Sequence, residues 1–185
     1  MRRRSALQAA LALASAAFLV GHSPYKQWYA YRSLRLIVVA SATDVHACVI
    51  ADAVSEQMLA RHPESNAMSA QARSARDVVQ MLRTHQLPVA VLDLPSAMAA
   101  YAGRGEFERE GALSLGILTA FDGYLLVCLE DFPQDKAYAI AEATALLPRS
   151  VGARARSGEP SFVAAIPFHP GALAFQQANP AQPER

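Results

Sequence analysis

Short apolar runs rich in β-branched residues alternate with stretches of helical spacing, and this alternation most constrains the fold of the chain. The strand-like runs are 34–40, 66–71 and 88–93. The helical stretches are 45–61, 74–84 and a shorter one that starts at Pro95 and ends before Gly103. Alternating strands and helices imply crossover connections and parallel strands. The sequence therefore predicts an α/β fold, a mostly parallel sheet flanked by helices.

The remaining part of the chain continues this pattern less regularly. Two further strand candidates, 113–119 and 124–129, are separated by Asp122-Gly123, and a helix is expected from Pro133 to Leu147. Beyond a polar loop over 149–160, we expect a last strand at 162–166 and a short helix at 171–177. With 185 residues, 52% of them hydrophobic, the chain can bury one sizeable core. We expect one lobe over 34–178 and a disordered tail at 179–185.

The N-terminal segment has the pattern of an export signal. Arginines at 2–4 precede an uncharged apolar run at 6–20, as in a secretory signal peptide or an uncleaved signal anchor. Aromatic and basic residues at 25–32 suit a membrane–water interface, although they can equally begin the folded domain. We therefore expect a signal anchor or signal peptide at 1–23 and an interfacial linker at 24–33. The protein would then be periplasmic, anchored in the inner membrane, or secreted to the periplasm if the segment is cleaved.

Charge and motifs exclude several classes of function. The 17 basic and 16 acidic residues leave a net charge of +1, which argues against a nucleic-acid partner. The sequence has no nucleophile elbow, phosphate-binding loop, dinucleotide fingerprint or zinc-ligand spacing. We therefore predict a non-catalytic protein without a cofactor or a metal.

Polar and charged residues follow each of the first three predicted strands. Because open α/β sheets bind ligands at the carboxyl ends of their strands, these residues are candidates for a small polar ligand site or a docking surface. The alternative is that they cap the following helices or are simply solvated. The candidates are Ser41, Thr43, Asp44, Arg73, Ser74 and Asp93.

The chain has two cysteines, Cys48 on the first predicted helix and Cys128 on a predicted core strand. An exported domain lies in an oxidising compartment, where a disulfide between them is feasible. Two separate buried thiols are the equally weighted alternative.

Three segments, in order, resemble the TAXI family, the solute-binding subunits of tripartite ATP-independent periplasmic (TRAP) transporters. The first is Asp93-Leu-Pro-Ser-Ala-Met-Ala-Ala-Tyr101-Ala-Gly103-Arg-Gly105-Glu-Phe107, an Ala-rich helix followed by Gly-x-Gly-x-Phe. The second, Tyr124 to Ile140, resembles the strand and helix by which the chain returns to the first lobe. The third is His169-Pro170-Gly171-Ala172, which resembles the family's C-terminal signature. The resemblance covers roughly 34–177.

The resemblance implies a single periplasmic-binding-protein-like lobe. Family members insert a second lobe in mid-chain, but here 111–119 runs almost directly into Tyr124. A non-catalytic solute-binding subunit with a TRAP permease or another periplasmic or membrane protein as partner is therefore expected. The alternative is an accessory interaction module that has lost solute binding. Such a module would expose an apolar patch around Leu113 to Tyr124, where the second lobe is missing.

Overall fold

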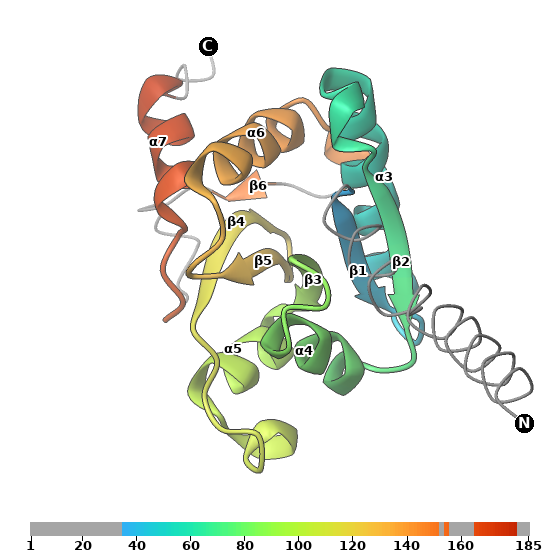
Figure 1. The fold of residues 1–185 in the computed structure, drawn as a ribbon, viewed down its shortest axis with the longest axis vertical. Helices are drawn as coiled ribbons and strands as arrows, with labels where there is room; N and C mark the ends of the chain where they lie inside the picture. Colours follow the sequence, from blue (N-terminus) through green and yellow to red (C-terminus); the bar gives the residue numbers. More distant parts are fainter. Residues whose placement is uncertain (1–34, 152–153, 156–164, 181–185) are drawn as a thin grey trace, which may run out of the picture. The chain divides into compact units, whose positions relative to one another are not determined.

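The computed structural model describes residues 35–151, 154–155 and 165–180. It is an α/β domain built on a six-stranded mixed sheet with strand order β2-β1-β3-β5-β4-β6 (Figure 1). The strands are β1 (Ile37–Ser41), β2 (Met68–Ala72), β3 (Val89–Asp93), β4 (Leu115–Phe121), β5 (Tyr124–Leu129) and the two-residue β6 (Arg154–Ala155). The helices are α3 (Val45–Arg61), α4 (Ala75–Arg83), α5 (Leu94–Ala102), α6 (Gln134–Ala145) and α7 (Pro170–Ala178).

The first three strands and their helices agree with the alternation in the sequence. β1 lies between β2 and β3 and is parallel to both. α3 begins after its N-cap Asp44 and ends at Arg61, with the C-cap His62 immediately before Pro63. α5 carries Pro95 in its first turn and ends at Gly103, whose φ of 61° suits a glycine at a helix end.

The second half of the sheet corrects the expectation of a mostly parallel arrangement. β5 is antiparallel to β3 and to β4, and β4 is antiparallel to β6. β4 and β5 are joined directly by Asp122-Gly123, with Gly123 at a φ of 75°. A connection of two residues can only form a hairpin, whereas parallel strands need a long crossover. The sheet is therefore mixed.

The expected strand at 162–166 is not formed in its described part. Ala165 and Ile166 lie in a bend, while residues 162–164 are outside the described ranges. Phe168 instead makes an isolated parallel bridge to Ile117. Ile117 donates its backbone N–H to the carbonyl of Pro167 at 2.9 Å, and its own carbonyl accepts from the backbone N–H of His169 at 2.8 Å.

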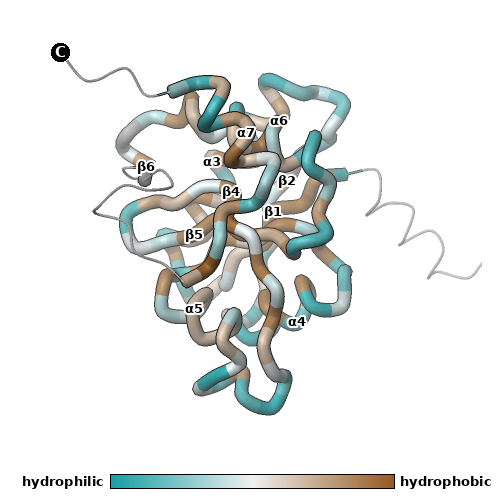
Figure 2. The backbone as a smooth tube through the Cα atoms, turned by 90° about the vertical axis from the view of Figure 1, so that its left-hand side faces the viewer, coloured by the Kyte–Doolittle hydropathy of each residue, from teal (hydrophilic) through white to brown (hydrophobic). Residues whose placement is uncertain are grey.

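Helices cover both faces of the sheet. Figure 1 shows α4 and α5 on one side and α3 and α6 on the other. Successive side chains of β1 point to opposite faces of the sheet. Val39 is buried in the core under α4 and α5, and Val38 is buried in the core under α3 and α6. In Figure 2 the hydrophobic colouring follows the central strands and the hydrophilic colouring follows the outer turns. Burial on both faces explains why the strands read as continuous apolar runs.

Some expectations fall on residues outside the described ranges. These are the signal segment 1–23, the linker 24–33 and the last five residues of the tail expected at 179–185. Within the described part of the chain, no helix has the length and apolar character that a membrane crossing requires.

Candidate functional site

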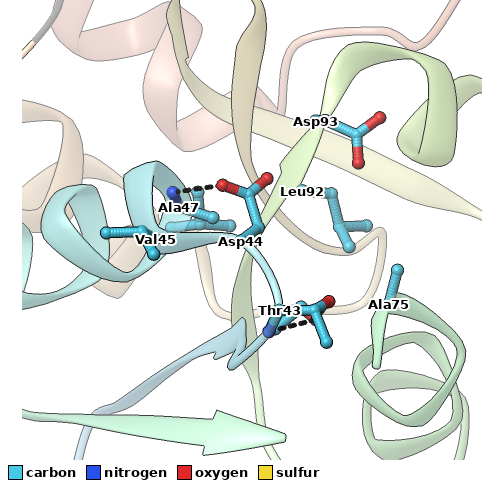
Figure 3. A pocket seen from close by; sticks show the side chains of 9 residues that line it. Thr43, Asp44, Val45, Ala47, Ala75, Leu92 and Asp93 are labelled. Atoms are coloured by element: carbon cyan, nitrogen blue, oxygen red, sulfur yellow. Dashed lines mark hydrogen bonds between the residues drawn. The ribbon is translucent and has the colours of Figure 1, made fainter. Parts of the chain in front are cut away.

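The helices that follow the neighbouring strands β1 and β3 lie on opposite faces of the sheet. From the carboxyl end of β1 the chain continues into α3 on one face, and from the carboxyl end of β3 it continues into α5 on the other face. Neighbouring parallel strands whose connections diverge in this way leave a crevice between them, the usual ligand position in open α/β sheets. A hollow of about 340 Å³ lies at this point (Figure 3). Its lining is Ser41, Thr43, Asp44, Val45, Ala47, Ala75, Val91, Leu92 and Asp93.

Two hydroxyl groups line the side of the hollow next to β1. Ser41 ends the strand and is buried, and its Oγ lies 2.8 Å from Thr43 Oγ1. The backbone N–H of Thr43 also donates to Ser41 Oγ at 3.4 Å. These contacts hold both hydroxyls in place at the entrance to α3.

Asp44 is the residue that caps α3, although Ser41 and Thr43 were also capping candidates. Its Oδ1 accepts the backbone N–H of Ala47 at 3.0 Å and the hydroxyl of Tyr124 at 3.2 Å. The first bond satisfies a helix N–H that has no partner within the helix. The second ties the start of α3 to the start of β5.

Asp93 repeats this arrangement on the other side of the hollow. It ends β3 and caps α5, and its Oδ1 accepts the backbone N–H of Ser96 at 2.8 Å. It also pairs with Tyr124 in the antiparallel register of β3 and β5. Figure 3 shows the carboxyl groups of Asp44 and Asp93 on these two neighbouring segments.

Tyr124 lies beside the hollow without lining it, and the candidates from the sequence did not include it. Its pKa is raised above the ordinary value by burial first, then by the charge and hydrogen bond of Asp44, and then by the charge of Asp93. Its ring contacts that of His46, with centroids 4.9 Å apart. The Asp122-Gly123 hairpin signal in the sequence places Tyr124 opposite the end of β4, and only the pairing of β5 with β3 brings it beside Asp93.

Arg73 and Ser74 do not line the hollow. The side chain of Arg73 is 91% exposed, and its Nε pairs with Asp77 Oδ2 at 3.1 Å. Ser74 caps α4, with its Oγ accepting the backbone N–H of Asp77 at 3.2 Å. The structure thus brings four of the six candidates together and gives these two the capping and surface roles that were the alternative.

The two cysteines are free thiols. Cys48 Sγ donates to the carbonyl of Ser41 at 3.3 Å, and Cys128 Sγ donates to that of Gly116 at 3.7 Å. Burial, followed by the charges of Asp52 and Asp44, raises the pKa of Cys48. Burial and then Asp131 raise the pKa of Cys128 to about 12. Neither thiol is activated as a nucleophile.

The segment His169-Pro170-Gly171-Ala172 forms the start of α7. His169 is buried and caps the helix, with its Nδ1 accepting the backbone N–H of Gly171 at 3.2 Å. A Cβ atom on Gly171 would collide with the carbonyl oxygen of Gln134 and lie 2.8 Å from Ala137 Cβ. Gly171 therefore allows α7 to approach α6 closely.

Among the described residues, no three His, Cys, Asp or Glu side chains are grouped as metal ligands would be. The hydrogen bonds of the hollow hold caps and turns, and its described lining contains no histidine or cysteine. The arrangement can hold a small molecule between hydroxyl and carboxylate groups. No protein-family model matches the chain, and no curated protein matches it.

Proposed function

We propose that this protein is a solute-binding-protein-like subunit of one lobe, which holds a small polar solute in the hollow between β1 and β3. As the resemblance to the TAXI family implies, it would serve a TRAP-type transporter from the periplasmic side of the inner membrane, held there by the N-terminal segment. The observation that carries the proposal is the position of the hollow at the topological switch point, where α/β proteins bind ligands.

The single lobe has a consequence for affinity. Two-lobed receptors close around a solute by a hinge, which removes it from water on all sides. The hollow here is open, so a solute bound to this lobe alone would be held weakly unless a second chain covers it. We therefore propose that the lobe works in contact with a membrane partner, and that it does no chemistry on the solute.

The proposal is tested by isolating the complex. The full-length protein would be solubilised in detergent, purified by affinity and analysed by mass spectrometry. Recovery of TRAP permease subunits supports the transport role. Recovery of an unrelated membrane or periplasmic complex with no permease subunit contradicts it. Asp52→Asn, an exposed change on α3, provides a control whose partners should match those of the wild type.

A second candidate is an accessory interaction module that no longer binds a solute. The apolar patch expected for it around Leu113 to Tyr124 is absent from the described surface, because Leu113 and all of β4 are buried in the domain. Exposed apolar side chains lie instead one turn apart on α3, at Val45 (76% exposed) and Val49 (48%). Val49 is outside the lining of the hollow, so Val49→Ser separates the two candidates. It should reduce partner recovery if the protein is an interaction module and leave solute binding unchanged.

A further inference from the structure

We infer that the hollow between β1 and β3 selects a small organic cation, a primary amine or another ammonium compound with a short hydrocarbon body. This inference rests on the proposed function, since it names the chemical class of the solute. It follows from the charges of the lining, the state of the helix N-termini that meet there, and the apolar wall.

The lining carries negative charge without a compensating positive charge. Of its nine residues, Asp44 and Asp93 are the two charged ones, and none is basic. Asp44 accepts the hydroxyl of Tyr124, and Asp93 is paired with Tyr124 in the register of β3 and β5. Both acidic residues therefore lie next to the start of β5. Arg73, the cationic candidate, is directed to Asp77 outside this lining.

Carboxylates already occupy the cap positions of both helix N-termini at the site. The N-termini of α3 and α5 would ordinarily favour an anion through their free N–H groups and the helix dipole. Here Asp44 already accepts the N–H of Ala47, and Asp93 already accepts that of Ser96. An anionic solute would meet a carboxylate at each helix start, whereas an ammonium group would be attracted by both carboxylates.

The remaining lining suits the other parts of such a solute. Ser41 and Thr43 offer hydroxyl oxygens that accept hydrogen bonds from an ammonium group. Val45, Ala75 and Leu92 provide an apolar wall for a few methylene groups. In Figure 3 Leu92 and Ala75 lie on the same side of the view, with Val45 on the other side.

The test compares three probes of equal length and different charge: n-butylammonium, n-butanol and butyrate. Binding to the full-length protein in detergent is measured by saturation-transfer difference NMR, which detects weak ligands. Butylammonium should bind most tightly, and butyrate should bind least. Raising the salt concentration should weaken butylammonium binding, because salt screens exposed charges.

Variants then assign the effect to the carboxylates. Asp44→Asn and Asp93→Asn remove each charge but keep a good N-cap residue, so the fold should be retained. Because exposed ion pairs are worth up to about 1 kcal/mol, each variant should weaken butylammonium binding about two- to fivefold. Asp52→Asn, the same change away from the hollow, should have no effect. Ala75→Leu, which fills the hollow, should abolish binding of every probe, and circular dichroism confirms that each variant is folded.

The outcomes separate this inference from the proposed function. If butanol or butyrate binds as tightly as butylammonium and Ala75→Leu abolishes that binding, the hollow is a solute site but the cation inference is overturned. If no probe binds, or if Ala75→Leu leaves binding intact, both the cation inference and the solute site are overturned. Loss of charge preference in the Asp44→Asn and Asp93→Asn double variant, with the fold retained, supports the inference.

Discussion

The hydroxyl of Tyr124 donates a hydrogen bond of 3.2 Å to Asp44 Oδ1, joining two residues that are 80 positions apart in the chain. Asp44 starts α3 and Tyr124 starts β5, so this contact links the two halves of the domain beside the candidate site. The same carboxylate caps the helix, and it therefore serves local and long-range structure at once.

Tyr124→Phe should make the protein less sensitive to alkali. The pKa of Tyr124 is raised in the folded state above its ordinary value of 10.0, so the unfolded chain loses this proton first as pH rises. The resulting contribution to stability is complete below pH 10 and is lost as pH rises through the folded-state pKa. At pH 8 the free energy of unfolding of the wild type should exceed that of Tyr124→Phe by about 1 kcal/mol. Urea unfolding between pH 8 and 11 should show this difference shrinking above pH 10. An advantage that does not change with pH would contradict the burial of this hydroxyl beside Asp44.

Asp44→Ala should be less stable than Asp44→Asn. Both variants lose the charge, but only asparagine keeps an oxygen that can accept the N–H of Ala47. Loss of an N-cap costs about 1 kcal/mol. Thermal unfolding of the two variants measures this difference, and Asp52→Ala, on the exposed side of α3, controls for the change in charge. Equal stability of the alanine and asparagine variants would show that Asp44 does not cap the helix.

The two cysteines should differ in reactivity toward iodoacetamide in the folded protein. Cys128 is fully buried and should remain unmodified, whereas Cys48 is partly exposed and should react slowly, because burial and the charges of Asp52 and Asp44 raise its pKa. Asp52→Asn should accelerate the labelling of Cys48 at pH 8 without changing that of Cys128. Peptide mass spectrometry assigns the modified cysteine, with Glu56→Gln as a control on the same helix. A disulfide between the two cysteines in the purified protein would contradict the free thiols of the structure.

Gly171→Ala should destabilise the protein by about 1–3 kcal/mol, the usual cost of overpacking a close contact. The added methyl group would collide with the carbonyl oxygen of Gln134 and press on Ala137, which forces α7 away from α6. Chemical denaturation measures the loss, and Ala174→Ser, on the exposed side of α7, should change stability far less. A neutral effect of Gly171→Ala would mean that the two helices pack less closely than described.

The helices were predictable because their ends depend on nearby residues. Asp44 and Ser74 cap α3 and α4 through backbone N–H groups three residues ahead, and Gly103 ends α5. Such signals act within one turn, so they are legible in the sequence. Among the capping candidates before α3, only the structure distinguishes Asp44 from Ser41 and Thr43, because their spacing permits each of them.

The antiparallel part of the sheet could have been predicted in part. Asp-Gly between two apolar runs is a strong hairpin signal, so the pairing of β4 with β5 was accessible. The position of β5 between β3 and β4 was not, since the strand order depends on which edge of the parallel sheet the hairpin joins. The exposed apolar patch expected around Leu113 to Tyr124 was also beyond local patterns. It is not found because β6 and the segment at Phe168 pair with β4.

The sequence by itself determined the α/β class, the bounds of α3, those of α4 and α5 to within one residue, and the presence of polar groups at the ends of the first strands. Caps, prolines, glycines and hydrophobic spacing act over a few residues and need no tertiary context. Only the tertiary structure decided that Asp44 and Asp93 each lie next to Tyr124 while Arg73 pairs with Asp77. Contacts between distant segments depend on strand order and on the packing of both faces of the sheet, which local patterns do not encode.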